Sequence, residues 1–118
     1  MSMIFFWLSA IAMTLTAVLH SFAGEKRLIG PLLAIDHPVT NRPLAQMVLR
    51  FAWHLTSLFM LLTAALVIWP NVPEDLVLTT GALWLVVGIF DAIYTRGQHI
   101  GWPLLTLAGL FAILGYIL

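Results

Sequence analysis

The sequence has no cysteine and few charged residues, and both absences narrow what the chain can be. Without cysteine there are no disulfides, no thiolate metal sites, no iron–sulfur clusters and no thiol redox chemistry. Only 8% of the residues are charged and 62% are hydrophobic, whereas a soluble domain is about a quarter charged. Such a chain could not cover a water-exposed surface with polar groups, so its composition predicts a membrane protein.

An excess of either charge is also missing. The five Lys and Arg residues balance five Asp and Glu residues, and the formal net charge is zero. A nucleic-acid-binding surface needs clustered basic residues in excess, and no run of like charge is long enough to form a tail. We therefore expect no nucleic-acid partner.

Long apolar stretches dominate the chain. A membrane-spanning helix needs about 20 apolar residues at a rise of about 1.5 Å each. The continuous stretches predict spans at residues 4–23, 47–69, 76–95 and 101–118. The first stretch lacks the basic segment of a signal peptide, so we interpret it as a retained span. The predicted fold is all-α: a polytopic membrane protein, with residues 1–118 forming a single bundle of four transmembrane helices.

Proline and acidic residues mark several helix ends. The second helix is expected to start near Pro43, because proline fits a first helical turn, with Asn41 as its cap. Pro70 and Pro73 should end that helix. Glu74 favours a helix N-terminus directly after them, where a carboxylate interacts well with the helix dipole.

The basic residues predict the orientation. All five lie in the first and third connecting segments or within one turn of them: Lys26, Arg27, Arg42, Arg50 and Arg96. Because connections rich in Lys and Arg stay in the cytoplasm, both termini should lie on the periplasmic side. We therefore expect a multi-pass protein of the bacterial inner membrane, with the lipid bilayer as its first partner.

The first connection, residues 24–46, is long for two neighbouring helices. Its segment 28–35 is apolar and is interrupted by Gly30 and Pro31. Two interpretations stay open for this segment. It lies at the headgroup level as a lid that moves, or it only packs across the end of the bundle.

Ionisable residues gather at one depth near the predicted cytoplasmic end. His20 closes the first span, His54 opens the second, Asp91 closes the third and His99 precedes the fourth. Helix rise places them roughly 5 Å inside the interface. Such groups are costly in hydrocarbon and should face the interior of the bundle or a water-filled cavity. Arg50 is expected to pair with Asp91 or with Glu25, because a guanidinium fork fits a carboxylate.

A divalent transition-metal site is the most concrete hypothesis for this layer. His20, His54, His99 and Glu25 form a ligand set suited to zinc, iron or copper ions. Arg50, Asp91, Tyr94 and Trp102 would then form a second shell or ion pairs around it. A metal-bound water could attack an amphiphilic or lipid-borne substrate, but the spacing is not diagnostic and leaves enzymatic activity open.

Three alternatives use the same residues differently. The polar layer could fix helix geometry in a non-catalytic accessory or assembly subunit of a larger membrane complex. His20 and His54 could instead ligate haem b, with room for the ring at Gly24, Gly88 and Gly101. Transport of protons or a small solute would require a homo-oligomer, because the periplasmic half of the predicted spans has no ionisable residue to continue a pathway across the membrane.

Three short motifs carry a resemblance. His-Ser-x-x-Gly-Glu occupies residues 20–25, Arg-x-x-Trp-His occupies 50–54 and His-x-x-Trp occupies 99–102. With them, nearly the whole chain resembles an uncharacterised family of small bacterial four-span integral membrane proteins. The resemblance implies the four-helix architecture and draws attention to the histidines of these motifs, but it carries no activity. The contacts of the His20, His54 and His99 rings should discriminate between a metal site and a structural role. Convergence of the three rings on one point favours a metal, and separate bonds to carboxylates or backbone oxygens favour a structural role.

Overall fold

The computed structural model describes all 118 residues and contains helices but no strands. The helices are α1 (Met3–Gly24), α2 (Gly30–Leu33), α3 (Pro43–Ile68), α4 (Glu74–Tyr94) and α5 (Trp102–Ile117), with a π-helical segment, Glu25–Ile29, between α1 and α2. The predicted all-helical bundle is confirmed. α3 starts at Pro43 and α4 starts at Glu74, as the proline and acidic residues predict.

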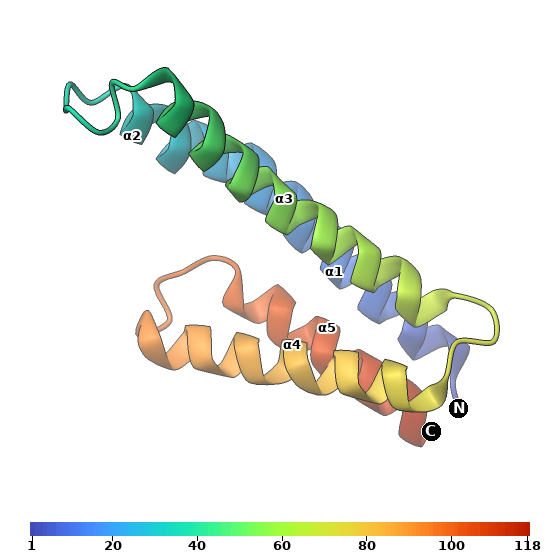
Figure 1. Ribbon diagram of the computed structural model, residues 1–118. Helices are drawn as coiled ribbons and strands as arrows, with labels where there is room; N and C mark the ends of the chain where they lie inside the picture. The colour runs from blue at the N-terminus through green and yellow to red at the C-terminus, as the bar shows by residue number, and fades with distance from the viewer.

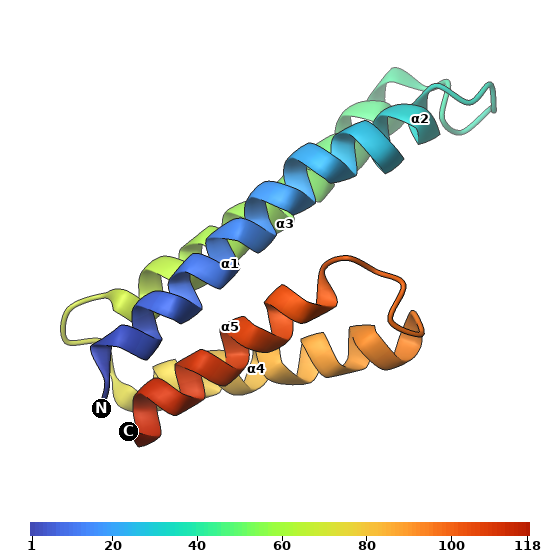
Figure 2. The ribbon, with the colours of Figure 1, turned by 180° about the vertical axis from the view of Figure 1, so that it is seen from behind.

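The helices form two antiparallel pairs, α1 with α3 and α4 with α5 (Figure 1). α1 also packs along α5, whereas α3 and α4 meet only slightly. Both views show the pairs close together where the termini lie and farther apart at the opposite end (Figures 1 and 2). The Ser2 amide donates to the Gly115 carbonyl at 2.8 Å, which ties the two termini to the same end. We call the opposite end the basic end, because it carries the five Lys and Arg residues named above.

Small residues let the helices approach closely. A Cβ added at Gly109 would lie 2.2 Å from the Leu85 amide nitrogen, and one added at Gly88 would lie 2.5 Å from the Thr106 amide nitrogen. Gly81 similarly faces Ala112. These contacts bring α4 against α5, so the small residues serve packing within the bundle. Between the pairs, the buried Ser9 hydroxyl donates to the Ala108 carbonyl at 2.6 Å.

The connection predicted at residues 24–46 is shorter than expected. The helix continues past Gly24 through the π-helical segment and α2, so only residues 34–42 form the turn into α3. Pro31 explains the local geometry, because it lacks an amide donor and its ring disturbs the preceding α-helical turn. The wider π-helical turn before it accommodates this mismatch, and the Gly30 amide bonds to the Glu25 carbonyl. Two residues of the apolar segment 28–35 pack inward, since Ile29 and Leu33 are buried.

The expected helix cap at Asn41 is wrong. Arg42 occupies the capping position, and it makes no side-chain cap. The Asn41 amide instead donates to Asp36 at 2.6 Å, and its oxygen accepts the His37 amide. Because Asp36 offers a nearby carboxylate, the Asn41 side chain stabilises the turn rather than the helix.

Three helical stretches are long and apolar enough to cross a membrane: Met3–Leu33, Pro43–Ile68 and Glu74–Tyr94. α5 is equally apolar in character but has only 16 residues. Large apolar side chains are exposed along the helices, among them Ile11, Phe59, Val86 and Phe90. Such surfaces match a hydrocarbon solvent, and three helices of this kind indicate a membrane protein.

Candidate polar site at the basic end

His20 of α1 and Trp53 of α3 form a reciprocal contact. Their rings are stacked, with centroids 4.1 Å apart and planes 10° from parallel. His20 Nε2 lies 3.1 Å from the Trp53 carbonyl oxygen, and Trp53 Nε1 donates to the His20 carbonyl at 2.7 Å. Gly24 makes room for the indole, because a Cβ there would lie 2.4 Å from Trp53 Nε1. Stacking and two interhelical hydrogen bonds therefore hold α1 against α3.

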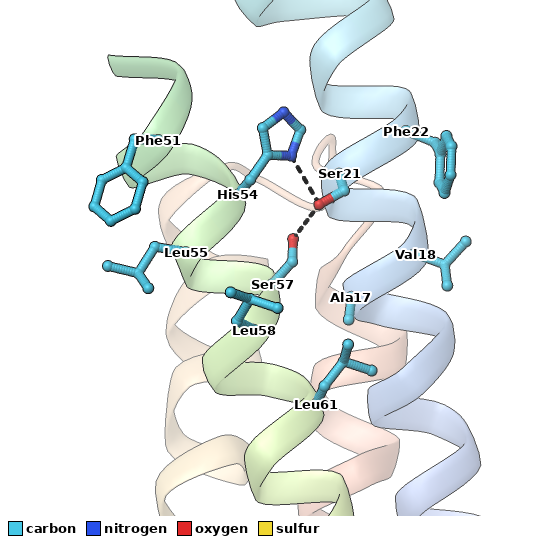
Figure 3. Close-up of a pocket in the computed structure, with 10 residues that line it drawn as sticks. All are labelled: Ala17, Val18, Ser21, Phe22, Phe51, His54, Leu55, Ser57, Leu58 and Leu61. Carbon is cyan, nitrogen blue, oxygen red and sulfur yellow. Dashed lines mark hydrogen bonds between the residues drawn. The ribbon is translucent and has the colours of Figure 1, made fainter. Parts of the chain in front are cut away.

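The next residues along both helices form a second, continuous set of hydrogen bonds. His54 Nδ1 lies 3.0 Å from Ser21 Oγ, and His54 Nε2 lies 3.1 Å from Glu25 Oε2. The Ser21 hydroxyl also bonds to Ser57 at 2.6 Å, as Figure 3 shows. Arg50 completes the set with contacts of 2.7 and 2.8 Å to Glu25 Oε1. We call these five residues the relay.

Helical spacing explains the relay. Ser21, near the end of α1, and Glu25, the first residue of the π-helical segment that continues it, are four residues apart. They share a face, as do Arg50 and His54 on α3. Each helix thus presents a short polar strip to the other, and the predicted pairing of Arg50 with Glu25 is confirmed. The exposed fractions of the Arg50 and Glu25 side chains are 47% and 34%, so this pair borders solvent while Ser57 is buried.

The second helix pair has its own contact at the same end. His99 Nδ1 bonds to the Asp91 carboxylate, and the Trp102 indole donates to the Gly97 carbonyl at 3.2 Å. Arg96 and Gly97 both have positive φ, 54° and 74°, which turns the chain sharply from α4 toward α5. Asp91 therefore pairs with His99 and not with Arg50.

Tyr94 is not part of this site. Its side chain is 77% exposed, and its ring stacks on Phe90 with centroids 5.5 Å apart. The expected second-shell role for Tyr94 finds no contact to support it. Four positions separate these two residues on α4, so they share an outward face of the helix.

The four predicted metal ligands fall into three separate groups. His20 bonds to the Trp53 carbonyl, His54 and Glu25 bond to each other, and His99 bonds to Asp91. No group of three or more His, Cys, Asp or Glu side chains is arranged to hold a metal ion. Only His54 and Glu25 of the set are in contact, and the contacts of the three rings match those expected for a structural role.

The room expected for haem is filled by side chains. Trp53 occupies the space beside Gly24, and Thr106 occupies the space beside Gly88. At Gly101, an added Cβ would lie 2.9 Å from the His99 ring. His20 and His54 also make different contacts rather than facing one another across an open slot. The geometry therefore gives no support to a bis-histidine haem at these positions.

A cleft of about 260 Å³ separates the two pairs at the basic end. Its apolar wall includes Leu19, Met60, Leu104 and Leu105, and its polar wall includes His20, Arg27, Gln98 and His99. No carboxylate lines it. Arg27 has no ion pair. The side-chain amide of Gln98, His20 Nδ1 and His99 Nε2 have no hydrogen-bond partner in the protein. The cleft thus combines an apolar interior with one cation, one free side-chain amide and two imidazole nitrogens that accept in the neutral rings.

A second hollow lies on the other side of α1 and α3, turned away from α4 and α5 (Figure 3). It has a volume of about 340 Å³ and is lined by Ser21 and His54 together with apolar side chains. A third hollow of about 350 Å³ adjoins it, because Leu61 lines both. We call the two hollows together the groove; their lining residues lie on α1 and α3, from Ser21 at one end to Trp7 and Ile68 at the other.

Sequence reasoning missed the hydroxyl and indole partners. Ser21 is only a motif position in the sequence, Ser57 only a small polar residue in a span, and Trp53 one of several tryptophans. One signal was available: His-Ser and Trp-His are adjacent pairs near the facing ends of two antiparallel helices.

The chain matches no protein-family model, and neither curated proteins nor solved structures yield a match.

Proposed function

We propose that this chain is a multi-pass protein of the bacterial inner membrane that binds an anionic amphiphile in the cleft between its two helix pairs. α5 would be the fourth, shorter span, since it lies beside α1 along the bundle. The positive-inside rule supports a cytoplasmic basic end. Both termini would then face the periplasm.

One observation carries the binding proposal: the cleft presents an unpaired Arg27 above an apolar wall and contains no carboxylate. A guanidinium binds phosphate or carboxylate through two parallel hydrogen bonds. The Gln98 side-chain amide adds a neutral donor beside it. Leu105 and Met60 would contact the chain of the ligand. Pockets between helices of a bundle commonly combine such walls with a few polar groups.

Native mass spectrometry of the detergent-solubilised protein tests the proposal. Phosphatidylglycerol and palmitate should bind more tightly than phosphatidylcholine, and their order tells whether phosphate or carboxylate is preferred. Arg27→Gln should weaken phosphatidylglycerol binding by about tenfold, since a hydrogen bond to a charged group contributes about 1.5–3 kcal/mol.

Arg42→Gln is the matched control, because Arg42 lies at the same end but does not line the cleft. It should leave binding nearly unchanged. Ala23→Phe should block binding, since Ala23 lines the cleft and a phenyl ring would fill it. Equal affinities for anionic and neutral lipids, or equal losses in the two arginine variants, would contradict the proposal.

A non-catalytic accessory subunit is the second candidate. It is favoured by the contacts of His20, His54 and His99, because each imidazole is bonded to a carboxylate or a backbone oxygen. This function predicts a stable larger complex, or a homo-oligomer, in mild detergent. It also predicts that Arg27→Gln changes neither complex size nor lipid binding. A metal ion stays a prediction from the sequence, which stoichiometric elemental analysis of the purified protein would test.

A further inference from the structure

We propose that Ser21 is a nucleophile, activated by His54 and Glu25, that cleaves carboxylic esters of lipids from the bilayer. This activity goes beyond the binding cleft, because it uses the opposite side of α1 and α3. The observations behind it are the contacts of His54 with Ser21 and Glu25 and the apolar groove that starts at Ser21 and His54.

The contacts of His54 define the direction of proton transfer. Nε2 faces the Glu25 carboxylate at 3.1 Å, and a carboxylate only accepts, so the imidazole proton resides on Nε2. In the neutral ring Nδ1 then carries a lone pair, and it lies 3.0 Å from Ser21 Oγ. In the structure the Ser21 hydroxyl donates to Ser57 Oγ at 2.6 Å. Rotation of this single proton onto the Nδ1 lone pair gives the arrangement of an activated serine.

Glu25 is the group that orients the base. Its second oxygen is held by Arg50 through contacts of 2.7 and 2.8 Å, which fixes the carboxylate toward His54. When Ser21 transfers its proton, His54 becomes an imidazolium held between Ser21 and Glu25. A nucleophile, its base and the group that orients the base are thus in hydrogen-bond contact, as such catalysis requires.

The groove explains why the substrate should be a lipid ester. Small and apolar residues line it from Ser21 toward the terminal end of the bundle, including Ala17, Leu58 and Ala65. Positions 7–21 of a helix extend over about 21 Å at about 1.5 Å per residue, so an acyl chain can lie along it. Its carbonyl would then reach Ser21 close to the interface, where the ester groups of a bilayer are found.

The reaction would proceed in two balanced steps. Ser21 Oγ attacks the ester carbonyl carbon, its proton passes to His54 Nδ1, and the alcohol leaves with that proton as the carbon–oxygen bond breaks. Water then attacks the acyl-serine, gives its proton to His54, and releases the fatty acid while the proton returns to Ser21. The backbone amides around Ser21 belong to α1. Ser57 Oγ, which accepts the Ser21 hydroxyl at 2.6 Å, keeps its own proton free to turn toward the oxyanion.

A fluorophosphonate with a long alkyl chain tests the nucleophile directly. Attack by an activated serine displaces fluoride and leaves a phosphonate of known mass on the protein. We expect one adduct per chain, located at Ser21 by tandem mass spectrometry and absent from Ser21→Ala. His54→Gln should slow labelling by about 100-fold or more, since general bases contribute about 10² to 10⁴ in rate.

Two controls separate reactivity from folding. Thr56→Ala, on α3 but bonded only to its own helix through the Ala52 carbonyl, should label like the unmodified protein. Ala65→Trp should slow the long-chain probe but not a short-chain one, because Ala65 lines the groove far from Ser21. No adduct on the unmodified protein in nanodiscs, or an adduct that persists in Ser21→Ala, would overturn the proposal. Arg27→Gln should not affect labelling, so failure of the cleft and failure of this site are distinguishable.

Discussion

His20 and Trp53 each hydrogen-bond to the other's backbone carbonyl while their rings stack 4.1 Å apart. Backbone carbonyls inside a helix already accept one bond, and each of these uses its second lone pair for the partner helix. The contact therefore joins α1 and α3 without breaking either helix. It requires a glycine at position 24, where any side chain would meet the indole.

Gly24→Ala should destabilise the protein. The new Cβ would lie 2.4 to 2.7 Å from three atoms of the Trp53 indole, so the ring or the helix must move. We expect a loss of about 1–3 kcal/mol in the free energy of unfolding, as overpacked cores show. Unfolding in mixed micelles, followed by circular dichroism, measures it.

Ala52→Val provides the control for Gly24→Ala. Ala52 is exposed on α3 beside Trp53, so added volume there meets lipid or detergent. Its effect should stay within about 0.5 kcal/mol. Equal effects of the two substitutions would argue against the proposed fit between Gly24 and the indole.

Ser9→Ala tests the link between the two helix pairs. The buried Ser9 hydroxyl donates to the Ala108 carbonyl of α5, and interhelical hydrogen bonds in membranes contribute about 0.6 kcal/mol on average and about 1.7 at most. Thr14→Ala is the matched control, because Thr14 bonds only to the Ala10 carbonyl of its own helix. In the same unfolding assay, we expect a measurable decrease in the free energy of unfolding for Ser9→Ala and almost no decrease for Thr14→Ala.

Helix positions were largely predictable from the sequence, and the pairing of helices was not. Apolar length and the prolines at 43, 70 and 73 predict where helices form, because both act locally. Which helices pair depends on close contacts such as Gly109 with Leu85 and Gly88 with Thr106. In a chain that is apolar on every side, hydrophobic periodicity does not reveal such faces.

The polar site was predictable in depth but not in connectivity. Helix rise places His20, His54 and His99 in one layer, and the guanidinium fit predicts Arg50 with Glu25. The division between two pairs then separates His99 from the other rings. The continuation of α1 through Pro31 was unpredictable for another reason, since proline usually ends a helix and the compensating π-helical turn has no clear sequence signal.

Substitutions of His54 and His99 should act independently. Each ring bonds to a carboxylate of its own helix pair, Glu25 or Asp91, and the two groups share no partner. The loss in the free energy of unfolding caused by His54→Ala and His99→Ala together should therefore equal the sum of the two single losses. We expect agreement to within about 0.5 kcal/mol. A metal held by both rings would instead make the two losses overlap strongly and make stability depend on added zinc.

Cysteine labelling can test the orientation directly, because the chain contains no native cysteine that would have to be replaced first. Glu74→Cys lies at the first residue of α4, and Val39→Cys lies in the turn before α3, at opposite ends of the bundle. Both side chains are exposed. If the basic end is cytoplasmic, a membrane-impermeant maleimide added to intact spheroplasts should modify Glu74→Cys and spare Val39→Cys until the membrane is opened. The reverse pattern would place the cleft and the relay on the periplasmic side, and it would contradict the positive-inside argument from which the orientation is inferred.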